Sequence, residues 1–541
     1  MTQQPRDTVE YIIIGAGSAG CVVANRLSTD PGCSVLLLEA GGRDDHVFLR
    51  MPLAFLKALF KPRFVWNYMS EPEPHLNGRQ LWLPRGRLLG GSSSINGMFY
   101  MRGHSSDFNA WRAMGCEGWG FEDVLPYFRR METSWRGAGH YHGANGPLHV
   151  VPIDTSRLLH DPLMRTAAAA GFQISEDLHG AVEEGFAKGE VTIDPRGRRA
   201  SSARAYLHPI MDRSNLRVET GASTNRILIS NGRAVGVEYV RDGQVRTVRA
   251  AREVIVCAGA YNSPQLLMLS GIGPADELGQ HGIDPVVDLP GVGRNLSEHA
   301  RVPVEFATRE PTSFLNELRW DRVAVSVARW ALFGTGPFAT QINSCNIVVR
   351  TVSTLAQPDV QLMCNPVRMD AKMWFPGVGK RQEHRITADA VVLHPQSRGH
   401  LTLRSADPKA PPRITLNLFA ESADLETARR GVALARMIYR TEPQSRITGR
   451  EIRPGPDIDS IEKLTAYIRA NAGVTQHPVG TCSMGVGPDA VVDPHLRVYG
   501  VTGLRVADAS IMPTVPGGNT NAASIMIGEK AADLVLAGPA P

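Results

Sequence analysis

The segment YIIIGAGSAG, residues 11–20, constrains the fold of this chain more than any other stretch. A short apolar run, typical of a β-strand, leads directly into Gly15, Gly17 and Gly20 in GxGxxG spacing. The following CVVANRLST has helical periodicity, and SVLLLEAGG predicts a second strand that ends at Glu39. Strand, glycine turn, helix, strand and acid together form a complete dinucleotide-binding unit.

Each residue of this unit has a physical role. Gly15 permits the tight turn, Gly17 lets the backbone approach a pyrophosphate at the helix N-terminus, and Gly20 lets helix and strand pack closely. Glu39, nineteen residues after Gly20, is placed to accept hydrogen bonds from an adenosine ribose. FAD and NAD share this ADP half, so the unit leaves the choice between them open.

Size and composition favour a large globular protein. A chain of 541 residues is too long for one ordinary core, which predicts two large units or a domain with big insertions. Hydrophobic residues make up 43% and charged residues 21%, as in ordinary globular proteins. The net charge of +5 is small, and the densest basic run, Arg196 to Arg199, indicates a solvated turn. We therefore expect no nucleic-acid partner.

Cysteine and histidine spacing argues against structural metals and disulfides. The seven cysteines are widely separated without a CxxC pair, HExxH is absent, and the sixteen histidines are dispersed. No metal site is expected, and the cysteine usage suits a reducing compartment. The N-terminus lacks the pattern of a secretory signal, and no apolar run reaches the roughly 18 residues needed to span a bilayer. We therefore expect a cytoplasmic protein.

One apolar segment qualifies this expectation. Residues 51–66, MPLAFLKALFKPRFVW, are apolar with interspersed Lys and Arg. The pattern favours a buried loop or lid over a cofactor, and peripheral docking on a membrane surface is the alternative.

Further motifs identify the cofactor through a family resemblance. GRLLGGSSSINGMFY (86–100), GAYNSPQLLMLSGIG (259–273) and GVGRNLSEH (291–299) are loops rich in glycine, serine and asparagine. In this order, with the C-terminal RVADASIMPTVPGGNTNAASIMIGEKAAD, they resemble the glucose-methanol-choline family of FAD-dependent alcohol oxidoreductases. The resemblance extends over essentially the whole chain, and it is greatest to the choline-dehydrogenase-like and bacterial alcohol dehydrogenase or oxidase branch.

The resemblance implies an α/β fold with two domains. An FAD-binding Rossmann-like domain is expected from residues 1–149, 206–299 and 466–541, and a substrate domain with an antiparallel sheet and helices from 150–205 and 300–465. The residues expected to bind FAD are Gly15, Gly17, Ser18, Ala19, Gly20, Glu39, Ala40, Arg87, Gly90, Gly91, Ser92, Asn96, Gly97, Met98, Asp508, Ala509, Asn519 and Thr520.

Two details concern the flavin itself. A helix is predicted to begin at Asn519 to Asn521, and its N-terminus would favour the negative charge that a flavin gains on reduction. Some members of the family attach FAD covalently through a histidine of the first signature. This chain has Ile95 at the corresponding position, so we expect non-covalent FAD.

The resemblance also assigns the chemistry. His477, in HPVGT, matches the histidine that acts as the base beside flavin N5, and Asn521 matches its partner, with Asn519 as the competing choice. Oxidising an alcohol requires removal of the hydroxyl proton while hydride leaves the α-carbon, and a neutral imidazole can take that proton near pH 7. An amide can hold the hydroxyl in place. The expected reaction is oxidation of a primary alcohol to the aldehyde.

Several alternatives stay open at this point. The family also contains lyases and photodecarboxylases, a choline-type dehydrogenase is a further reading, and the electron acceptor is either oxygen or a carrier such as a quinone. A serine hydrolase is disfavoured because GxSxG is absent. Candidates to line an apolar substrate pocket, with ordinary core packing as the alternative, are Phe314, Trp320, Trp330, Phe338, Met363, Trp374 and Phe375.

Overall fold

A mixed sheet built around the first glycine motif forms one half of the molecule. The computed structural model describes residues 8–378 and 382–538. The strand order of the sheet is β10-β11-β12-β1-β2-β9, and β24 lies beside β12. Strand β1 pairs in parallel with both β2 and β12. Its strands are β1 (Thr8–Ile14), β2 (Val35–Glu39), β9 (Leu216–Thr220), β10 (Ser223–Ser230), β11 (Arg233–Arg241), β12 (Gln244–Val256) and β24 (Leu504–Val506).

The predicted dinucleotide unit is present as β1, helix α1 (Gly20–Leu27) and β2. Gly15 has φ +98°, and a Cβ there would lie 2.5 Å from the carbonyl oxygen of Cys257. A Cβ on Gly20 would lie 1.9 Å from the carbonyl oxygen of Gly15. Both positions therefore require glycine for the turn between strand and helix.

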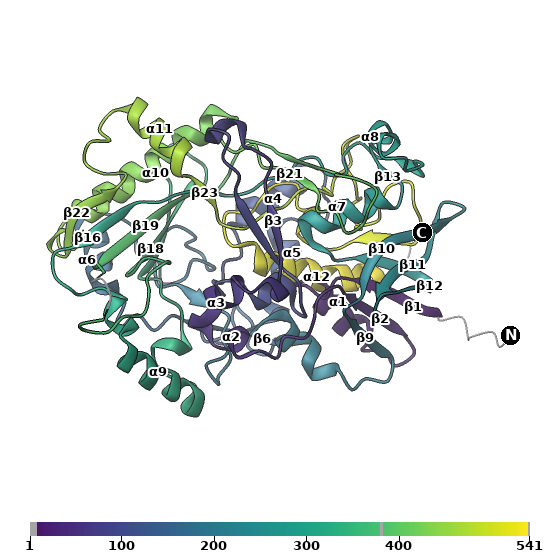
Figure 1. Cartoon of the computed structure of the whole chain (residues 1–541), viewed down its shortest axis with the longest axis horizontal. Helices are drawn as coiled ribbons and strands as arrows, with labels where there is room; N and C mark the ends of the chain where they lie inside the picture. The colour runs from purple at the N-terminus through teal and green to yellow at the C-terminus, as the bar shows by residue number, and fades with distance from the viewer. Residues whose placement is uncertain (1–7, 379–381, 539–541) are drawn as a thin grey trace.

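A second sheet is antiparallel and forms the other half of the molecule (Figure 1). Its order is β22-β16-β19-β18-β17-β7, and β15 joins β19 to β23. The strands are β7 (Gly185–Ala187), β15 (Ala300–Val302), β16 (Glu305–Thr308), β17 (Cys345–Val349), β18 (Val360–Asn365), β19 (Arg385–Val392), β22 (Thr448–Arg453) and β23 (Gly473–Val474). The division into two domains at the boundaries expected from the sequence remains a prediction.

Helices cover the second sheet and fill the space between the two halves. Helix α10 (Ser422–Arg440) is amphipathic and packs on β18 and β19 through its buried face, which includes Leu425, Ala428, Val432 and Ala435. The C-terminal helix α12 (Thr520–Leu536), yellow in Figure 1, lies centrally and contacts α1 and α5. The other helices are α2 (Val47–Arg50), α3 (Phe55–Leu59), α4 (Ser105–Ala113), α5 (Phe121–Met131), α6 (His160–Ala169), α7 (Gly259–Leu269), α8 (Ala275–Gln280), α9 (Trp320–Phe333) and α11 (Ile461–Asn471).

Short strand pairs complete the fold. They are β3 (Val65–Met69) with β4 (Trp82–Gly86), β5 (Glu132–Ser134) with β6 (Leu148–Pro152) and β8 (Glu190–Val191), β13 (Ile272–Gly273) with β14 (Val287–Asp288), and β20 (His400–Thr402) with β21 (Arg413–Thr415). Within the described ranges, no helix has the length and apolar character needed to cross a membrane.

Candidate active site

A cavity of about 790 Å³ extends from Glu39 at the end of β2 to His477. Its wall combines the first glycine turn, the GGSSSIN loop, the start of α7, Asp508 and the N-terminus of α12. The predicted cofactor residues that line it are Gly15, Gly17, Ser18, Ala19, Glu39, Ala40, Gly91, Ser92, Asn96, Gly97, Met98, Asp508, Ala509, Asn519 and Thr520.

Three predicted cofactor residues support this wall from behind. Gly20 closes the turn, as described above, and the amide of Gly90 donates to the carbonyl of Ala16 at 2.7 Å. The guanidinium of Arg87 stacks over Trp66, 4.4 Å from the ring centroid. None of the three lines the cavity, and their contact with the cofactor stays a prediction.

The chemistry of the wall fits FAD. Glu39 Oε2 accepts from the amide of Ala16 at 3.0 Å and Oε1 from that of Gly41 at 2.8 Å, which fixes the carboxylate where a ribose would lie. A Cβ on Gly91 would lie 2.8 Å from the Cα of Gly17, so the two glycine loops approach each other without side chains between them. An extended cavity with an acid at one end and bare backbone along its wall matches a dinucleotide.

A buried arginine fixes the second glycine loop, contrary to the expectation of a solvated turn. Arg199 is 1% exposed, and its guanidinium donates to the carbonyls of Ser93 and Asn96 and to Asn96 Oδ1. The turn itself lies at Arg196 to Arg198. Sequence reasoning missed this role because a run of basic residues gives no sign of which member is buried.

The apolar segment at residues 51–66 forms part of the cavity wall. Phe55, Leu56 and Leu59 on α3, with Phe60 and Trp66, line it. Phe60 is 67% exposed and stacks on Trp82 with ring centroids 5.1 Å apart. This placement agrees with the reading as a loop over the cofactor.

His477 lies at the far end of the cavity and contacts Asn519, not Asn521. The Nδ2 atom of Asn519 is 3.0 Å from His477 Nε2. Asn521 Oδ1 instead accepts from Ser18 Oγ at 2.8 Å, on the side of the first glycine turn. The pairing of His477 with Asn521 expected from the sequence is therefore wrong, and the competing residue Asn519 is the partner. Asn519 occupies the N-cap position of α12 without capping it through its side chain.

Hydrogen bonds fix the tautomer of His477. His299 Nε2 lies 2.9 Å from the carbonyl oxygen of Leu393, which can only accept, so neutral His299 carries its proton there. His299 Nδ1 must then accept from His477 Nδ1, 3.0 Å away, and Thr475 Oγ1 lies 2.8 Å from the same atom. This arrangement leaves the lone pair of His477 on Nε2, which faces Asn519.

Burial keeps both imidazoles neutral. His477 is 8% exposed, and burial, followed by His299 and Arg85, holds the pKa of His477 well below its usual range. Burial and His394 lower the pKa of His299 to about 3. His477 is therefore unprotonated at neutral pH and can accept a proton.

The backbone at His477 is held in a strained conformation. Gln476 has φ +69°, in the left-handed region that a residue other than glycine rarely adopts. Arg85 donates to its carbonyl at 3.0 Å and to its Oε1 at 2.7 Å, and Gln476 Nε2 donates to the carbonyl of Trp82 at 3.0 Å. These contacts fix the direction in which the next residue projects.

A smaller cavity of about 80 Å³ adjoins Asn519, and polar side chains line it together with apolar ones that supply most of its exposed surface. Of the seven residues expected to form an apolar pocket, Met363 lines it, whereas the other six line neither cavity. Trp320 and Phe375 are exposed, and the remainder pack into core clusters. Sequence reasoning missed the amides that line the smaller cavity: Gln341, Asn343, Asn346, Gln361 and Asn365. For Asn346, Gln361 and Asn365 the signal was a polar residue within a buried strand.

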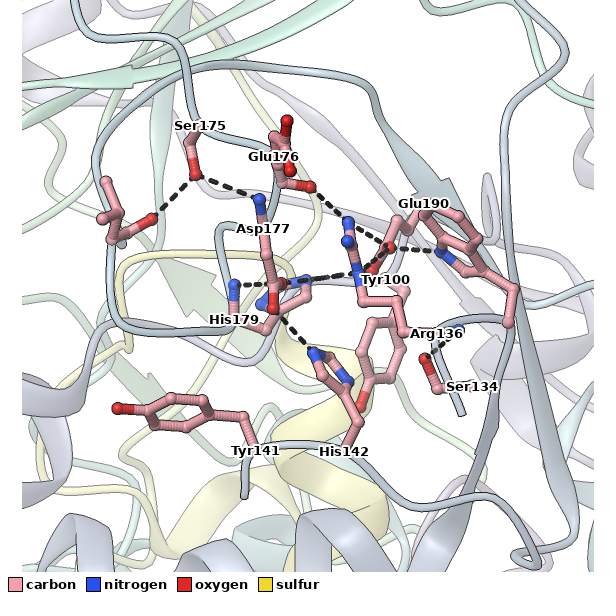
Figure 2. Close-up of polar contacts among 12 residues, drawn as sticks. Tyr100, Ser134, Arg136, Tyr141, His142, Ser175, Glu176, Asp177, His179 and Glu190 are labelled. Carbon is pink, nitrogen blue, oxygen red and sulfur yellow. Dashed lines mark hydrogen bonds and ion pairs between the residues drawn. The ribbon is translucent and has the colours of Figure 1, made fainter. Parts of the chain in front are cut away.

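An ionic network lies behind Tyr100 and Glu190, which line the smaller cavity (Figure 2). Glu190 Oε1 accepts from Trp135 at 2.6 Å and from Arg136 at 3.1 Å. Nearby, His142 Nε2 lies 2.8 Å from Asp177. Burial opposes the charge on His142, but hydrogen bonds to Asp177 and Glu132 raise its pKa to about 9. The carboxylates of this network are thus neutralised by cations of the protein.

Comparison with known proteins agrees with these features. Models of the GMC oxidoreductase family match residues 9–301 and 395–528. The chain is 44% identical over 530 residues to an oxygen-dependent choline dehydrogenase from Sinorhizobium fredii, covering 97% of this chain and 95% of the relative.

Solved structures show the same fold. The pyridoxine 4-oxidase from Mesorbium loti is 30% identical with a TM-score of 0.88, covering 98% of this chain and 100% of that one. A formate oxidase from Aspergillus oryzae RIB40 is 26% identical with a TM-score of 0.91, covering 99% of each chain.

Proposed function

The chain belongs to the GMC oxidoreductase family, and on this premise we propose that it oxidises a primary alcohol to the aldehyde with FAD as the hydride acceptor. The observation that carries the proposal is the pair of His477 Nε2 and Asn519 Nδ2, 3.0 Å apart at the end of the cavity that fits FAD.

The two side chains divide the work. FAD, when bound, supplies the acceptor for the hydride that leaves the α-carbon of the alcohol. The unprotonated Nε2 of His477 takes the hydroxyl proton, so that the carbonyl bond forms as hydride departs. Asn519 Nδ2 donates to the hydroxyl oxygen and holds it against His477. His299 and Thr475 keep the His477 proton on Nδ1 and so keep Nε2 available.

Other residues would hold the cofactor. We infer that Glu39 accepts from the ribose hydroxyls and that the glycine loops pass along the pyrophosphate. The N-terminus of α12 would favour negative charge at the flavin. FAD is held without a covalent bond, since Ile95 offers no nucleophile at the position where some relatives carry histidine. Oxygen or another electron acceptor, such as a quinone, completes the cycle.

A choline-type activity is the second candidate, because curated relatives such as the one from Sinorhizobium fredii are named oxygen-dependent choline dehydrogenases. Both candidates use the same proton acceptor and the same hydride acceptor. They differ in the group that the substrate carries beyond its carbinol carbon.

The proposal predicts that His477→Ala slows the reduction of the flavin by alcohol and leaves FAD binding unchanged. Anaerobic addition of primary alcohols should bleach the flavin absorbance of the wild-type holoenzyme, because reduction removes the oxidised flavin band. The variant should bind FAD normally but be reduced more slowly by about two to four powers of ten, the usual loss when a general base is removed. His140→Ala, at an exposed histidine, is the matched control.

Two results would contradict the proposal. The assignment of His477 fails if the variant is reduced at the wild-type rate. Product that forms while the flavin stays oxidised would indicate a lyase. Repeating steady-state turnover with oxygen and with an artificial acceptor identifies which acceptor the enzyme uses.

A further inference from the structure

Arg301 places a positive charge in the substrate region of the site. It lies on β15, two residues after His299, and lines both the large cavity and the smaller one. In extended chain, residues two apart point to the same side and lie roughly 7 Å from each other. Arg301 therefore lies on the same side of the chain as His299, whose ring contacts His477.

Part of the guanidinium is free to bind a ligand. Its Nη1 pairs with Asp389 Oδ2 at 2.6 Å, whereas Nη2 makes no hydrogen bond to any of the described residues. The Arg301 side chain is 35% exposed and that of Asp389 8%. Both members of the ion pair line the smaller cavity, and the cation is the more exposed of the two.

The two carboxylates in the wall of the smaller cavity, Glu190 and Asp389, are each paired with an arginine. Asp389 is occupied by Arg301, and Glu190 accepts from Trp135 and Arg136. Lys409 adds a second cation to the wall of the large cavity. A quaternary ammonium substrate would therefore meet an exposed positive charge, whereas the two carboxylates beside it are buried and paired with arginines.

The neighbouring amides do not take over the role of the arginine. The side-chain nitrogens of Asn343, Asn346 and Gln361 already donate to Cys364, Met101 and Asn346. Arg301 retains donors in the planar arrangement that suits a carboxylate.

We propose that this enzyme acts on primary alcohols that carry a carboxylate at their other end, with Arg301 binding that carboxylate. The inference rests on the proposed alcohol oxidation and names its substrate class as ω-hydroxy acids. His477 and Asn519 hold the hydroxyl, and Arg301 holds the distal anion. The aldehyde acid is the product, and the two electrons pass to FAD as in the parent reaction.

Three alcohols that share a hydroxyethyl group test the charge preference. They are 3-hydroxypropanoate, the uncharged 3,3-dimethyl-1-butanol, and choline. We expect kcat/KM of the wild type to decrease in that order. Longer ω-hydroxy acids then show which spacing between hydroxyl and carboxylate matches the site.

Variants connect the preference to Arg301. In Arg301→Gln the ratio of kcat/KM for 3-hydroxypropanoate over 3,3-dimethyl-1-butanol should fall roughly ten- to a hundredfold, the loss expected for a hydrogen bond between charged groups. Because Asp389 would be left unpaired, the double variant Arg301→Gln/Asp389→Asn is measured as well and should show the same fall. Lys57→Gln, at an exposed cation that lines neither cavity, is the matched control and should leave the ratio unchanged.

A binding measurement separates this inference from the proposed function. The carboxylate 3,3-dimethylbutanoate has no hydroxyl to oxidise, and its binding is followed by the change in flavin absorbance of the holoenzyme. Binding that weakens at least tenfold in both Arg301 variants supports the inference even if no alcohol is turned over. Equal binding in wild type and variants, or choline preferred over the uncharged alcohol, overturns it and leaves alcohol oxidation standing.

Discussion

At the scale of single residues, two asparagines two positions apart have different partners. Asn519 is the N-cap of α12 with an extended backbone, whereas Asn521 lies in the first helical turn, so their side chains leave the chain in different directions. Asn519 therefore contacts His477, and Asn521 contacts Ser18 of the first glycine turn. One residue serves the substrate end of the cavity and the other serves the cofactor end.

Alanine substitutions should separate these roles. Asn519→Ala should lower the rate of flavin reduction by alcohol roughly ten- to a hundredfold, since a donor to the substrate oxygen is lost. Asn521→Ala should mainly weaken FAD binding, because Ser18 loses its acceptor. Stopped-flow reduction and FAD titration of the apoprotein measure the two effects. The reverse pattern would restore Asn521 as the catalytic partner.

At the scale of elements, Glu298 joins the two chain segments that carry the histidines. Its Oε1 accepts from the amide of His477 at 2.7 Å and from that of His299 at 3.0 Å. Ser297 and Val479 add a pair of backbone hydrogen bonds between the same segments. Burial raises the pKa of Glu298 to about 8, although Arg85 and the two amides act against the rise.

This pKa predicts a pH-dependent stability. Because the folded carboxyl retains a proton that the unfolded chain loses from about pH 4.5, the contribution of Glu298 to stability decreases as pH rises to about 8. Glu298→Gln stays neutral and keeps the Oε1 acceptor. Its melting temperature relative to the wild type should therefore increase between about pH 5 and about pH 8.

Thermal unfolding of both proteins across this range checks the prediction. Glu117→Gln, at an exposed glutamate, is the control and should track the wild type. A constant difference between Glu298→Gln and the wild type at all pH values would show that Glu298 is ionised throughout.

At the scale of the whole molecule, segments from both ends of the chain form one site. The cavity wall draws on β1 and β2 near the N-terminus, on α7, and on α12 near the C-terminus. A ligand that contacts all of these segments stabilises the folded state by mass action. FAD should therefore act as a structural component as well as the hydride acceptor.

Removal of FAD should lower the melting temperature. Free FAD at a hundred times its Kd contributes about 2.7 kcal/mol to folding, so apoprotein and reconstituted holoenzyme should differ in calorimetry. After denaturation and ultrafiltration, the flavin should appear in the filtrate, because Ile95 forms no bond to it. Flavin that stays with the denatured chain would refute non-covalent attachment.

The sequence by itself determined the first half of the cofactor site. Gly15, Gly20 and Glu39 belong to one contiguous strand, turn, helix and strand, so their relative positions follow from local geometry. Helix α12 was likewise predictable, because a capping residue followed by an apolar stripe at helical spacing is a local signal.

Only the tertiary structure decided what surrounds His477. Which asparagine faces it depends on how α12 is rotated against the rest of the site, and Arg301 enters the cavity because β15 lies between β19 and β23. Arg199 is buried for the same kind of reason, since its partners are about a hundred positions away in sequence. Such contacts depend on packing between distant segments, and no local pattern encodes them.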